Sequence, residues 1–372
     1  SKRLQDLCHQ YDPTRPVTQG MDRAEDALKS GFAQVMDVPG FNYRVHKYEN
    51  NIKQLPKGFL LGSETASTVS SRGVYKFPVT VSDKNTYPDG QCSSYDTEYC
   101  SWSNLPDDDW RCQEDYPWVI GEFVWTGYDY LGEPTPYDEY WPSRSSYFGI
   151  CDLAGLPKDR YYLYRSHWNK QSHTVHLLPH WTWPGREGEV TPVYCYTDAP
   201  EAELFVNGKS QGRIRKQKDS RLDRFRLRWN DVVYEPGEIK VVAYGSDGSV
   251  IGEQTIATAG EPTAMSLSSD RNTINADKDD MAFIEVSMTD AKGTFCPTLS
   301  DDLTFEVSGA GSFEAACNGD ATSLQPFKQP EMKLFSGKAV VIVRSNGERG
   351  RINLTVTNRQ RNITKTITIE AR

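Results

Sequence analysis

The segment Phe59-Leu60-Leu61-Gly62-Ser63-Glu64-Thr65-Ala66-Ser67 is the most informative about the architecture of the first half of the chain. Its apolar half, Phe59 to Gly62, shows no polar alternation, which is typical of a strand covered on both faces. Similar strand-like runs occur elsewhere in the first half of the chain, at Val17 to Gly20, Ala33 to Val38 and Trp118 to Trp125. Helical patterns separate these runs, so the sequence predicts four parallel βα units.

Four βα units do not close a barrel. Either the sheet is open and doubly wound, or it is half of an eightfold barrel whose first four units are missing. An open-sheet nucleotide enzyme would need a Gly-rich loop after its first strand, and Val17 to Asp22 offers only Gly20. We therefore favour the half barrel. Before the first strand, Leu4, Leu7, Cys8 and Tyr11 fall on one face of a predicted helix.

From about Ser172 the pattern changes to short alternating runs separated by turn residues, among them Asn207-Gly208, the preferred dipeptide of two-residue hairpins. Gly260-Glu261-Pro262 interrupts these runs, and further strand-like segments follow it. The sequence thus predicts an α/β domain over 1–170, a β-sandwich over 171–259 and a second β-sandwich over 260–372.

Composition excludes several classes of function. The net charge of −9 argues against nucleic acid as a partner, and we interpret the basic run from Arg213 to Arg228 as a solvated sheet face. The sequence contains no run of 18 apolar residues, so it predicts no membrane-spanning helix. The spacing of Cys92, Cys100 and Cys112 does not suggest a zinc site, and it fits a disulfide and three free thiols equally well.

Catalytic residues of parallel βα folds follow the carboxyl ends of strands. Those positions hold Asp22, Asn42, Tyr43, His46, Glu64 and Trp125. Glu64 stands among small residues that leave room for a ligand, although a helix-capping role is the commoner reading of such a position. Glycoside hydrolysis needs two carboxyl groups. The other candidates are Asp22, Glu122, Asp129 and Glu133, and none of them is compelling as the acid.

Three segments carry a resemblance to a known family. Leu61 to Ser67 with Ser70-Ser71-Arg72-Gly73, Gly121 to Thr135, and Ser146 to Gly155 with Lys158-Asp159 resemble glycoside hydrolase family 2 β-galactosidases. The resemblance extends over the whole chain. It implies the second half of a TIM (β/α)8 barrel followed by two immunoglobulin-like β-sandwich domains.

The resemblance also implies roles for single residues. Glu64 matches the nucleophile, Tyr43 the tyrosine that hydrogen-bonds it, and Trp125 the tryptophan that stacks on the sugar. Asn42 precedes Tyr43 as in the family, and Asp22 lies where some relatives bind galactose hydroxyls. His46 joins them as a substrate-binding candidate from its position. No organic cofactor is expected. Some relatives hold a metal ion near the site, and no ligand set for such an ion is evident in this sequence.

The family's general acid/base is a Glu preceded by Asn, and no Asn-Glu pair occurs here. We therefore expect a carboxyl-terminal piece of a retaining β-galactosidase that is active on oligo- or polymeric β-galactosides only with its amino-terminal half. A β-glucuronidase, a β-mannosidase and a non-catalytic carbohydrate-binding or structural fragment are the alternatives. Glucuronidases usually carry an Asn-x-Lys motif after the seventh barrel strand, and none follows the corresponding run Phe59 to Gly62 in the first part of this chain. Substrate logic suggests a secreted or periplasmic protein, and the role of 88–116 stays open.

Overall fold

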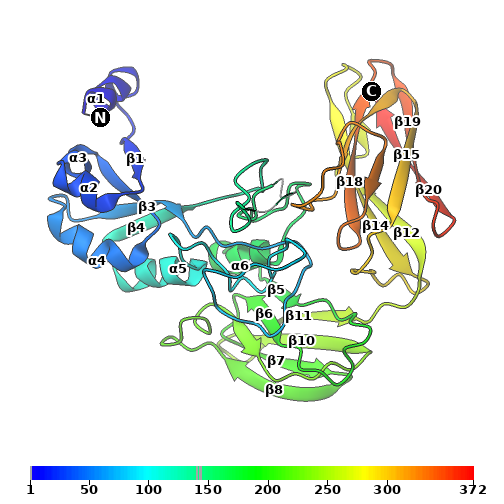
Figure 1. The fold of residues 1–372 in the computed structure, drawn as a ribbon, viewed down its shortest axis with the longest axis horizontal. Helices are drawn as coiled ribbons and strands as arrows, with labels where there is room; N and C mark the ends of the chain where they lie inside the picture. Colours follow the sequence, from blue (N-terminus) through cyan, green and yellow to red (C-terminus); the bar gives the residue numbers. More distant parts are fainter. Residues whose placement is uncertain (1, 140, 142–144) are drawn as a thin grey trace.

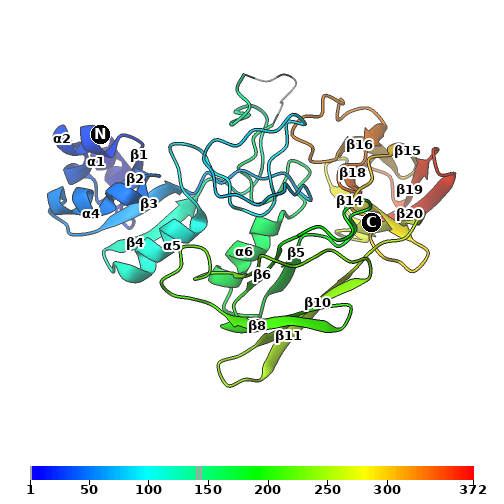
Figure 2. The same cartoon turned by 60° about the horizontal axis from the view of Figure 1, so that its bottom comes forward.

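The computed structural model describes residues 2–139, 141 and 145–372, and it arranges them in three parts (Figure 1). The first part surrounds a parallel sheet near the amino terminus. The second and third parts are built of antiparallel strands, and a loop-rich region lies between the three parts in both views (Figure 2). No helix in the described ranges is long and apolar enough to cross a membrane.

The first part contains the four predicted parallel strands in sequential order, β1 to β4. The strands are β1 (Thr18–Met21), β2 (Val38–Asn42), β3 (Leu60–Thr65) and β4 (Val119–Val124). The helices are α1 (Lys2–Tyr11), α2 (Ala24–Lys29), α3 (Phe32–Val35), η1 (Val45–Lys47), α4 (Tyr48–Asn51), η2 (Ile52–Gln54) and α5 (Pro106–Asp115). Buried Phe41, Tyr48 and Leu60 belong to the core of this part. The prediction of parallel βα units is confirmed.

Two strand boundaries differ from the prediction, and both differences bring site residues closer to strand ends. Ala33 lies in α3 rather than in a strand, because the left-handed backbone of Gly31 starts a short helix that buries Ala33. β2 therefore begins only at Val38 and ends on Asn42. β3 extends beyond the apolar run to Thr65, so Glu64 lies inside the strand.

Helix α1 forms as predicted, but its apolar face is not covered in the described structure. Leu4 is 62% exposed and Tyr11 is 83% exposed. The helix is held instead by Gln5, whose amide donates to the carbonyl of Val35 (3.0 Å) and accepts from the backbone of Asp37 (2.8 Å). Apolar periodicity thus predicted the helix correctly, while its attachment is polar.

The second part follows helix α6 (Asp159–Trp168) and comprises two antiparallel sheets. One sheet contains β5 (Val175–Leu178), β6 (Val193–Thr197) and β9 (Leu227–Trp229); the other contains β7 (Glu201–Val206), β8 (Lys209–Arg215), β10 (Glu238–Tyr244) and β11 (Val250–Ala257). Asn207 and Gly208 both have positive φ and join β7 to β8, which confirms the predicted hairpin turn.

The third part is a pair of sheets that pack on each other through apolar side chains such as Ile284, Val341 and Leu354. One sheet contains β12 (Pro262–Ser269), β14 (Met281–Asp290), β18 (Lys338–Ser345) and β16 (Gly311–Cys317); the other contains β13 (Thr273–Ile274), β20 (Ile363–Ala371), β19 (Gly350–Asn358), β15 (Asp302–Gly309) and β17 (Glu331–Lys333). The predicted boundaries near 170 and 259 fall between elements, and the division into three domains stays a prediction.

Part of the basic run is not a solvated sheet face, so that interpretation is wrong for its second half. Three arginines between β8 and β9 pair with carboxylates of helix α5: Arg221 with Asp108, Arg224 with Asp115 and Arg226 with Asp107. The side chains of Arg226 and Asp107 are both fully buried. The run therefore joins the second part to the first, which spacing along the chain did not reveal.

All eight cysteines are free thiols, including Cys92, Cys100 and Cys112. Of the two alternatives left open by the sequence, the structure thus has the one without a disulfide. Cys92 and Cys100 are buried, and burial raises the pKa of the Cys92 thiol well above its usual value. Burial therefore keeps Cys92 protonated and unreactive.

Candidate active site

The carboxyl ends of β2, β3 and β4 meet at one edge of the parallel sheet. The backbone amide of Tyr43 donates to the carbonyl of Glu64 (2.7 Å), and the amide of Trp125 donates to the carbonyl of Thr65 (2.9 Å). These two bonds continue the hydrogen-bonding ladder beyond the ends of β2 and β4. Three residues from distant parts of the sequence, Tyr43, Glu64 and Trp125, are therefore held at the same sheet edge.

The side chains of Tyr43 and Glu64 are hydrogen-bonded to each other. The phenolic oxygen of Tyr43 donates to Oε2 of Glu64 over 2.8 Å. Burial raises the pKa of the Tyr43 phenol well above its ordinary value, the charges of Glu64 and Glu133 raise it further, and a hydrogen bond with Ser67 lowers it. Tyr43 thus stays a neutral donor, and its hydrogen bond fixes the orientation of the half-buried carboxyl group of Glu64.

Asn42 ends β2 beside this pair. Its Oδ1 accepts a hydrogen bond from the hydroxyl of Ser63 over 2.8 Å. Gly20 on β1 leaves the space that the amide occupies, since a Cβ there would lie 2.8 Å from Oδ1 of Asn42. The small residues of neighbouring strands therefore fix where this amide lies.

Trp125 follows β4 directly, and its indole ring is held by a neighbour that sequence reasoning did not assign. The indole Nε1 donates to the hydroxyl of Tyr130 over 3.1 Å, and the two rings meet edge to face with centroids 5.9 Å apart. Tyr130 in turn donates to a carboxylate oxygen of Glu133. The only signal for Tyr130 in the sequence was its place in the same family-like segment as Trp125.

In the described part of the chain, no hydrogen bond or ion pair joins Asp22 or His46 to Glu64. Asp22 pairs with Arg44 and lines a hollow of about 210 Å³ on the α2 side. His46 is exposed and lines a different cavity, of about 340 Å³, together with Tyr99 and Arg221. Both hollows lack the pair of Tyr43 and Glu64, so the predicted substrate-binding roles of these two residues stay predictions without geometric support.

The remaining candidate acids lie in different surroundings. Glu122 accepts hydrogen bonds from Trp110 on α5 and from Thr65, both over 2.7 Å, and burial raises the pKa of its carboxyl. Thr65 therefore directs its hydroxyl toward Glu122, whereas the carboxylate of Glu64 accepts from Tyr43. The two carboxyl groups thus have different hydrogen-bond partners.

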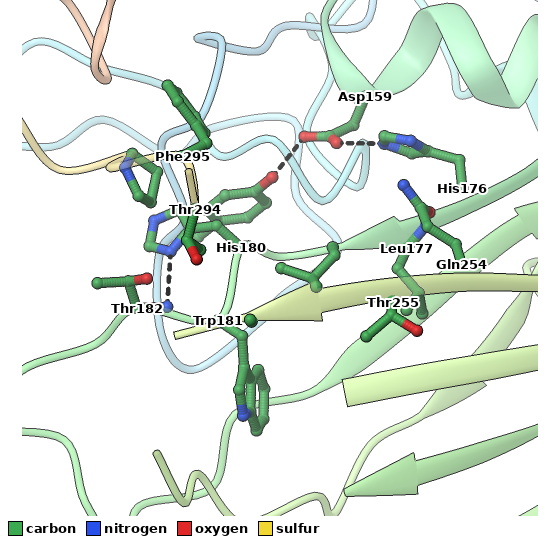
Figure 3. Close-up of a pocket in the computed structure, with 14 residues that line it drawn as sticks. Asp159, His176, Leu177, His180, Trp181, Thr182, Gln254, Thr255, Thr294 and Phe295 are labelled. Atoms are coloured by element: carbon green, nitrogen blue, oxygen red, sulfur yellow. Dashed lines mark hydrogen bonds and ion pairs between the residues drawn. The ribbon is translucent and has the colours of Figure 1, made fainter. Parts of the chain in front are cut away.

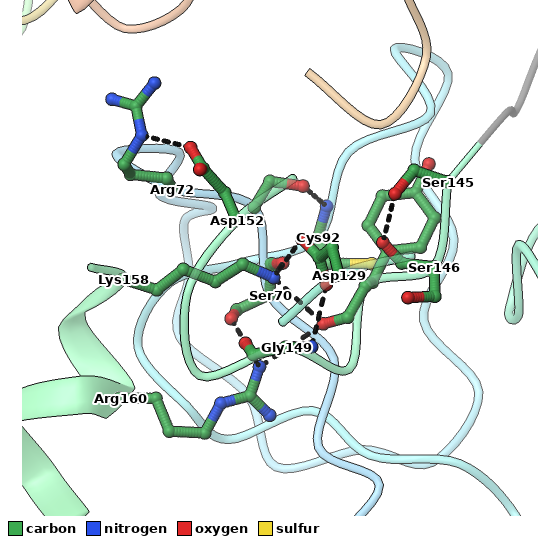
Figure 4. A network of polar contacts seen from close by, with 12 residues as sticks. Ser70, Arg72, Cys92, Asp129, Ser145, Ser146, Gly149, Asp152, Lys158 and Arg160 are labelled. Atoms are coloured by element: carbon green, nitrogen blue, oxygen red, sulfur yellow. Dashed lines mark hydrogen bonds and ion pairs between the residues drawn. The ribbon is translucent and has the colours of Figure 1, made fainter. Parts of the chain in front are cut away.

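A network of buried charges supports the loops around the site (Figure 4). Lys158 pairs with Asp129 over 2.7 Å, and Arg72 pairs with Asp152 over 2.6 Å. Lys158 also donates to the carbonyl of Ser70 over 2.7 Å. Burial raises the pKa of Asp129 to about 6 against the opposing effect of Lys158. The network ties the segment after β3 to the segment after β4, and both segments adjoin strands that carry candidate site residues.

A cavity of about 460 Å³ lies elsewhere, between the second and third parts (Figure 3). Within it Asp159 accepts a hydrogen bond from Tyr75 and contacts His176, both over 2.7 Å. The predicted site residues do not line this cavity. Its size alone does not connect it with the chemistry at the sheet edge.

Among the described residues, no three His, Cys, Asp or Glu side chains are grouped so that they could hold a metal ion. The expectation that no cofactor is needed stays a prediction.

Comparison with known sequences gives matches over almost the whole chain. The sequence model of glycoside hydrolase family 2 C-terminal domain 5 matches residues 265–366, and a domain of unknown function matches residues 188–252. The chain is 39% identical to the β-galactosidase BoGH2A of Bacteroides ovatus over 96% of its own length. It is 29% identical to a putative β-glucuronidase of Formosa agariphila over 90% of its length.

Solved structures also match almost the whole chain. A β-glycosidase from Bacteroides vulgatus superposes with a TM-score of 0.84 at 33% identity, covering 99% of this chain and 48% of that one. A glycosyl hydrolase family 2 member from Bacteroides cellulosilyticus superposes with a TM-score of 0.80 at 27% identity. The chain spans less than half the length of the two curated relatives, 42% of the first and 34% of the second.

Proposed function

We propose, on the premise that this chain belongs to glycoside hydrolase family 2, that it carries the nucleophile of a retaining β-galactosidase. The observation that carries the proposal is the hydrogen bond between Tyr43 and Glu64 at the carboxyl edge of a parallel sheet, with Trp125 on the next strand. Active sites of βα barrels lie at that edge. The four sequential parallel strands support a half barrel, and the two antiparallel parts are proposed to be immunoglobulin-like.

In this mechanism the carboxylate of Glu64 attacks the anomeric carbon while the bond to the leaving oxygen breaks. The leaving oxygen takes a proton from a general acid, and a glycosyl ester of Glu64 remains. Water then cleaves the ester with the acid now serving as base, and the configuration is retained. Tyr43 holds one oxygen of Glu64, and the apolar face of Trp125 packs against the sugar ring.

The general acid is proposed to come from a part of the polypeptide outside these 372 residues. Two observations support this. The relatives extend well beyond the matched region, and Glu122 and Asp129 are engaged in contacts away from Glu64. The chain by itself is then expected to be inactive, and its partners are the amino-terminal part and a β-galactoside. A polymeric substrate favours a secreted or periplasmic location.

β-Glucuronidase activity is the second candidate, because a similar protein of Formosa agariphila has that assignment. β-Mannosidase activity and a non-catalytic carbohydrate-binding role complete the alternatives. A panel of nitrophenyl β-galactoside, β-glucuronide and β-mannoside separates the three activities, and binding without turnover of any of them would identify the non-catalytic role.

The test compares the intact gene product with its Glu64→Gln variant and with these 372 residues alone. Glu253→Gln on β11, an exchange of the same kind outside the site, is the matched control. We expect loss of galactoside hydrolysis in Glu64→Gln, normal activity in the control and none in the 372-residue chain. A 2-fluoro galactoside should label Glu64 in the wild type, as read by peptide mass spectrometry. Full activity of Glu64→Gln would refute the assignment.

A further inference from the structure

Trp125, Tyr130 and Glu133 form a chain of directed hydrogen bonds at the rim of the candidate site. The indole N–H of Trp125 can only donate, and it donates to Tyr130. The hydroxyl of Tyr130 therefore has its own proton free for Glu133, to which it donates. We call these two hydrogen bonds the relay. Both donors point in the same direction, from Trp125 through Tyr130 to the carboxylate of Glu133.

The loop backbone presents that charge in an unusual conformation. Glu133 has φ of +46°, in the left-handed region, directly after Gly132 with φ of +94°. A non-glycine residue in this region costs free energy, and such residues concentrate at sites of function. Burial and the hydrogen bond to Glu133 together raise the pKa of the Tyr130 phenol, so Tyr130 remains a donor to the carboxylate.

Glu133 is connected to the candidate site in two ways. Its relay leads to Trp125, whose backbone is bonded to Thr65, the neighbour of Glu64. Its charge also acts on Tyr43, together with that of Glu64. The candidate site is thus bordered by two carboxylates, one at the proposed nucleophile and one at the rim.

We propose that Glu133 is a specificity-determining residue that favours neutral sugars over sugars carrying a carboxylate. The inference rests on the proposed function and deepens it. A uronic acid would bring a third negative charge beside Glu64 and Glu133, whereas a neutral hexose would offer hydroxyl groups that a carboxylate accepts. Through Tyr130, Glu133 also positions the indole ring of Trp125. Glu133 therefore affects both the charge at the rim and the orientation of the ring on which the sugar stacks.

Two variants of the intact gene product separate these effects. Glu133→Gln removes the charge and keeps an oxygen that accepts from Tyr130. Tyr130→Phe breaks the relay and keeps the charge. For each variant, kcat and KM are measured with nitrophenyl β-galactoside and nitrophenyl β-glucuronide at low and high salt, because screening weakens a charge effect.

We expect Glu133→Gln to raise the ratio of glucuronide to galactoside kcat/KM about tenfold at low salt, mainly through the KM of the glucuronide. The gain should shrink at high salt. Tyr130→Phe should raise the KM of both substrates and leave their ratio unchanged. An unchanged ratio in Glu133→Gln, or an equal shift in both variants, would overturn the proposal.

Failure of the proposed function is distinguishable from failure of this inference. If the intact protein hydrolyses neither substrate, the galactosidase proposal fails. The role of Glu133 is then tested by the ratio of the affinities for glucuronic acid and galactose, measured by calorimetry. The criterion is the same: Glu133→Gln must shift that ratio toward glucuronic acid, and Tyr130→Phe must not. A wild type that prefers the glucuronide would refute the galactoside assignment while the variant ratio still decides the role of Glu133.

Discussion

Tyr43 and Glu64 are joined twice, once between main chains over 2.7 Å and once between side chains over 2.8 Å. The main-chain bond holds the end of β2 against β3. Tyr43 and Glu64 therefore lose little further conformational freedom when their side chains form the second hydrogen bond. A donor placed in this way is pre-organised, which is the condition under which a single hydrogen bond contributes most to a reaction.

Tyr43→Phe should lower kcat of the intact gene product. The variant removes a hydrogen bond to a charged acceptor, which contributes about 1.5 to 3 kcal/mol and corresponds to roughly a 10- to 150-fold loss. The measurement is steady-state hydrolysis of nitrophenyl β-galactoside alongside thermal unfolding. Tyr48→Phe is the matched control, since the described structure gives the buried hydroxyl of Tyr48 no hydrogen-bond partner. Equal losses in both variants would contradict a specific role for Tyr43.

Gly149→Ala should destabilise the loops behind the site. A Cβ at Gly149 would lie 2.1 Å from the backbone nitrogen of Asp129 and 2.2 Å from the carbonyl oxygen of Cys151, so the main chain would have to move. We expect a loss of about 3 kcal/mol in the free energy of unfolding. Gly127→Ala has open space around its Cβ and serves as the control, with a change within about 0.5 kcal/mol. The measurement is the urea midpoint of unfolding for each variant. Similar midpoints would show that the main chain around Gly149 moves easily enough to accept a Cβ.

Arg226→Met should weaken the contact between the second part and helix α5. The substitution leaves the fully buried carboxylate of Asp107 without its cation, a situation that costs about 3 to 5 kcal/mol. Arg215→Met removes an arginine whose side chain is 63% exposed and should cost less than about 1 kcal/mol. Urea unfolding of both variants measures the difference. A cost for Arg226→Met no larger than that for Arg215→Met would mean that the buried pair does not stabilise the contact.

His180→Asn should make the protein less sensitive to acid. Burial lowers the pKa of His180 to about 3 from an ordinary value of 6.5, and Nδ1 accepts a hydrogen bond from the backbone of Thr182 over 3.3 Å. As the pH falls, His180 is protonated in the unfolded chain near pH 6.5 but in the folded chain only near pH 3. The free energy of unfolding therefore keeps the whole contribution of His180 above pH 6.5 and loses it progressively as the pH falls from 6.5 toward 3. The loss amounts to about 2 kcal/mol between pH 6.5 and 4.5. Asparagine keeps an acceptor and does not titrate.

Thermal unfolding of the wild type and of His180→Asn across this pH range tests the prediction. The wild type should lose stability more steeply than the variant as the pH falls from 6.5 to 4.5. Parallel curves for the two proteins would show that His180 does not supply the acid sensitivity.

Features that depend on local sequence pattern could be predicted before the structure was known. Continuous apolar runs predicted the parallel strands, Asn207-Gly208 predicted a hairpin, and small residues after an apolar run drew attention to Glu64. These features are set by backbone preferences and by side-chain periodicity within a few residues, so a reader of the chain can recover them. The family resemblance added the pairing of Tyr43 with Glu64, which the structure has as a hydrogen bond.

Contacts between side chains that are far apart in the sequence could not be predicted and became visible in the folded chain. It buried Arg226 against Asp107, it paired Asp22 with Arg44, and it ended the relay from Trp125 on Glu133. The physical reason is that a charged residue has the same appearance in a sequence whether it is solvated or buried. Its partner and its surroundings come from elements that only the folded chain brings within hydrogen-bond distance.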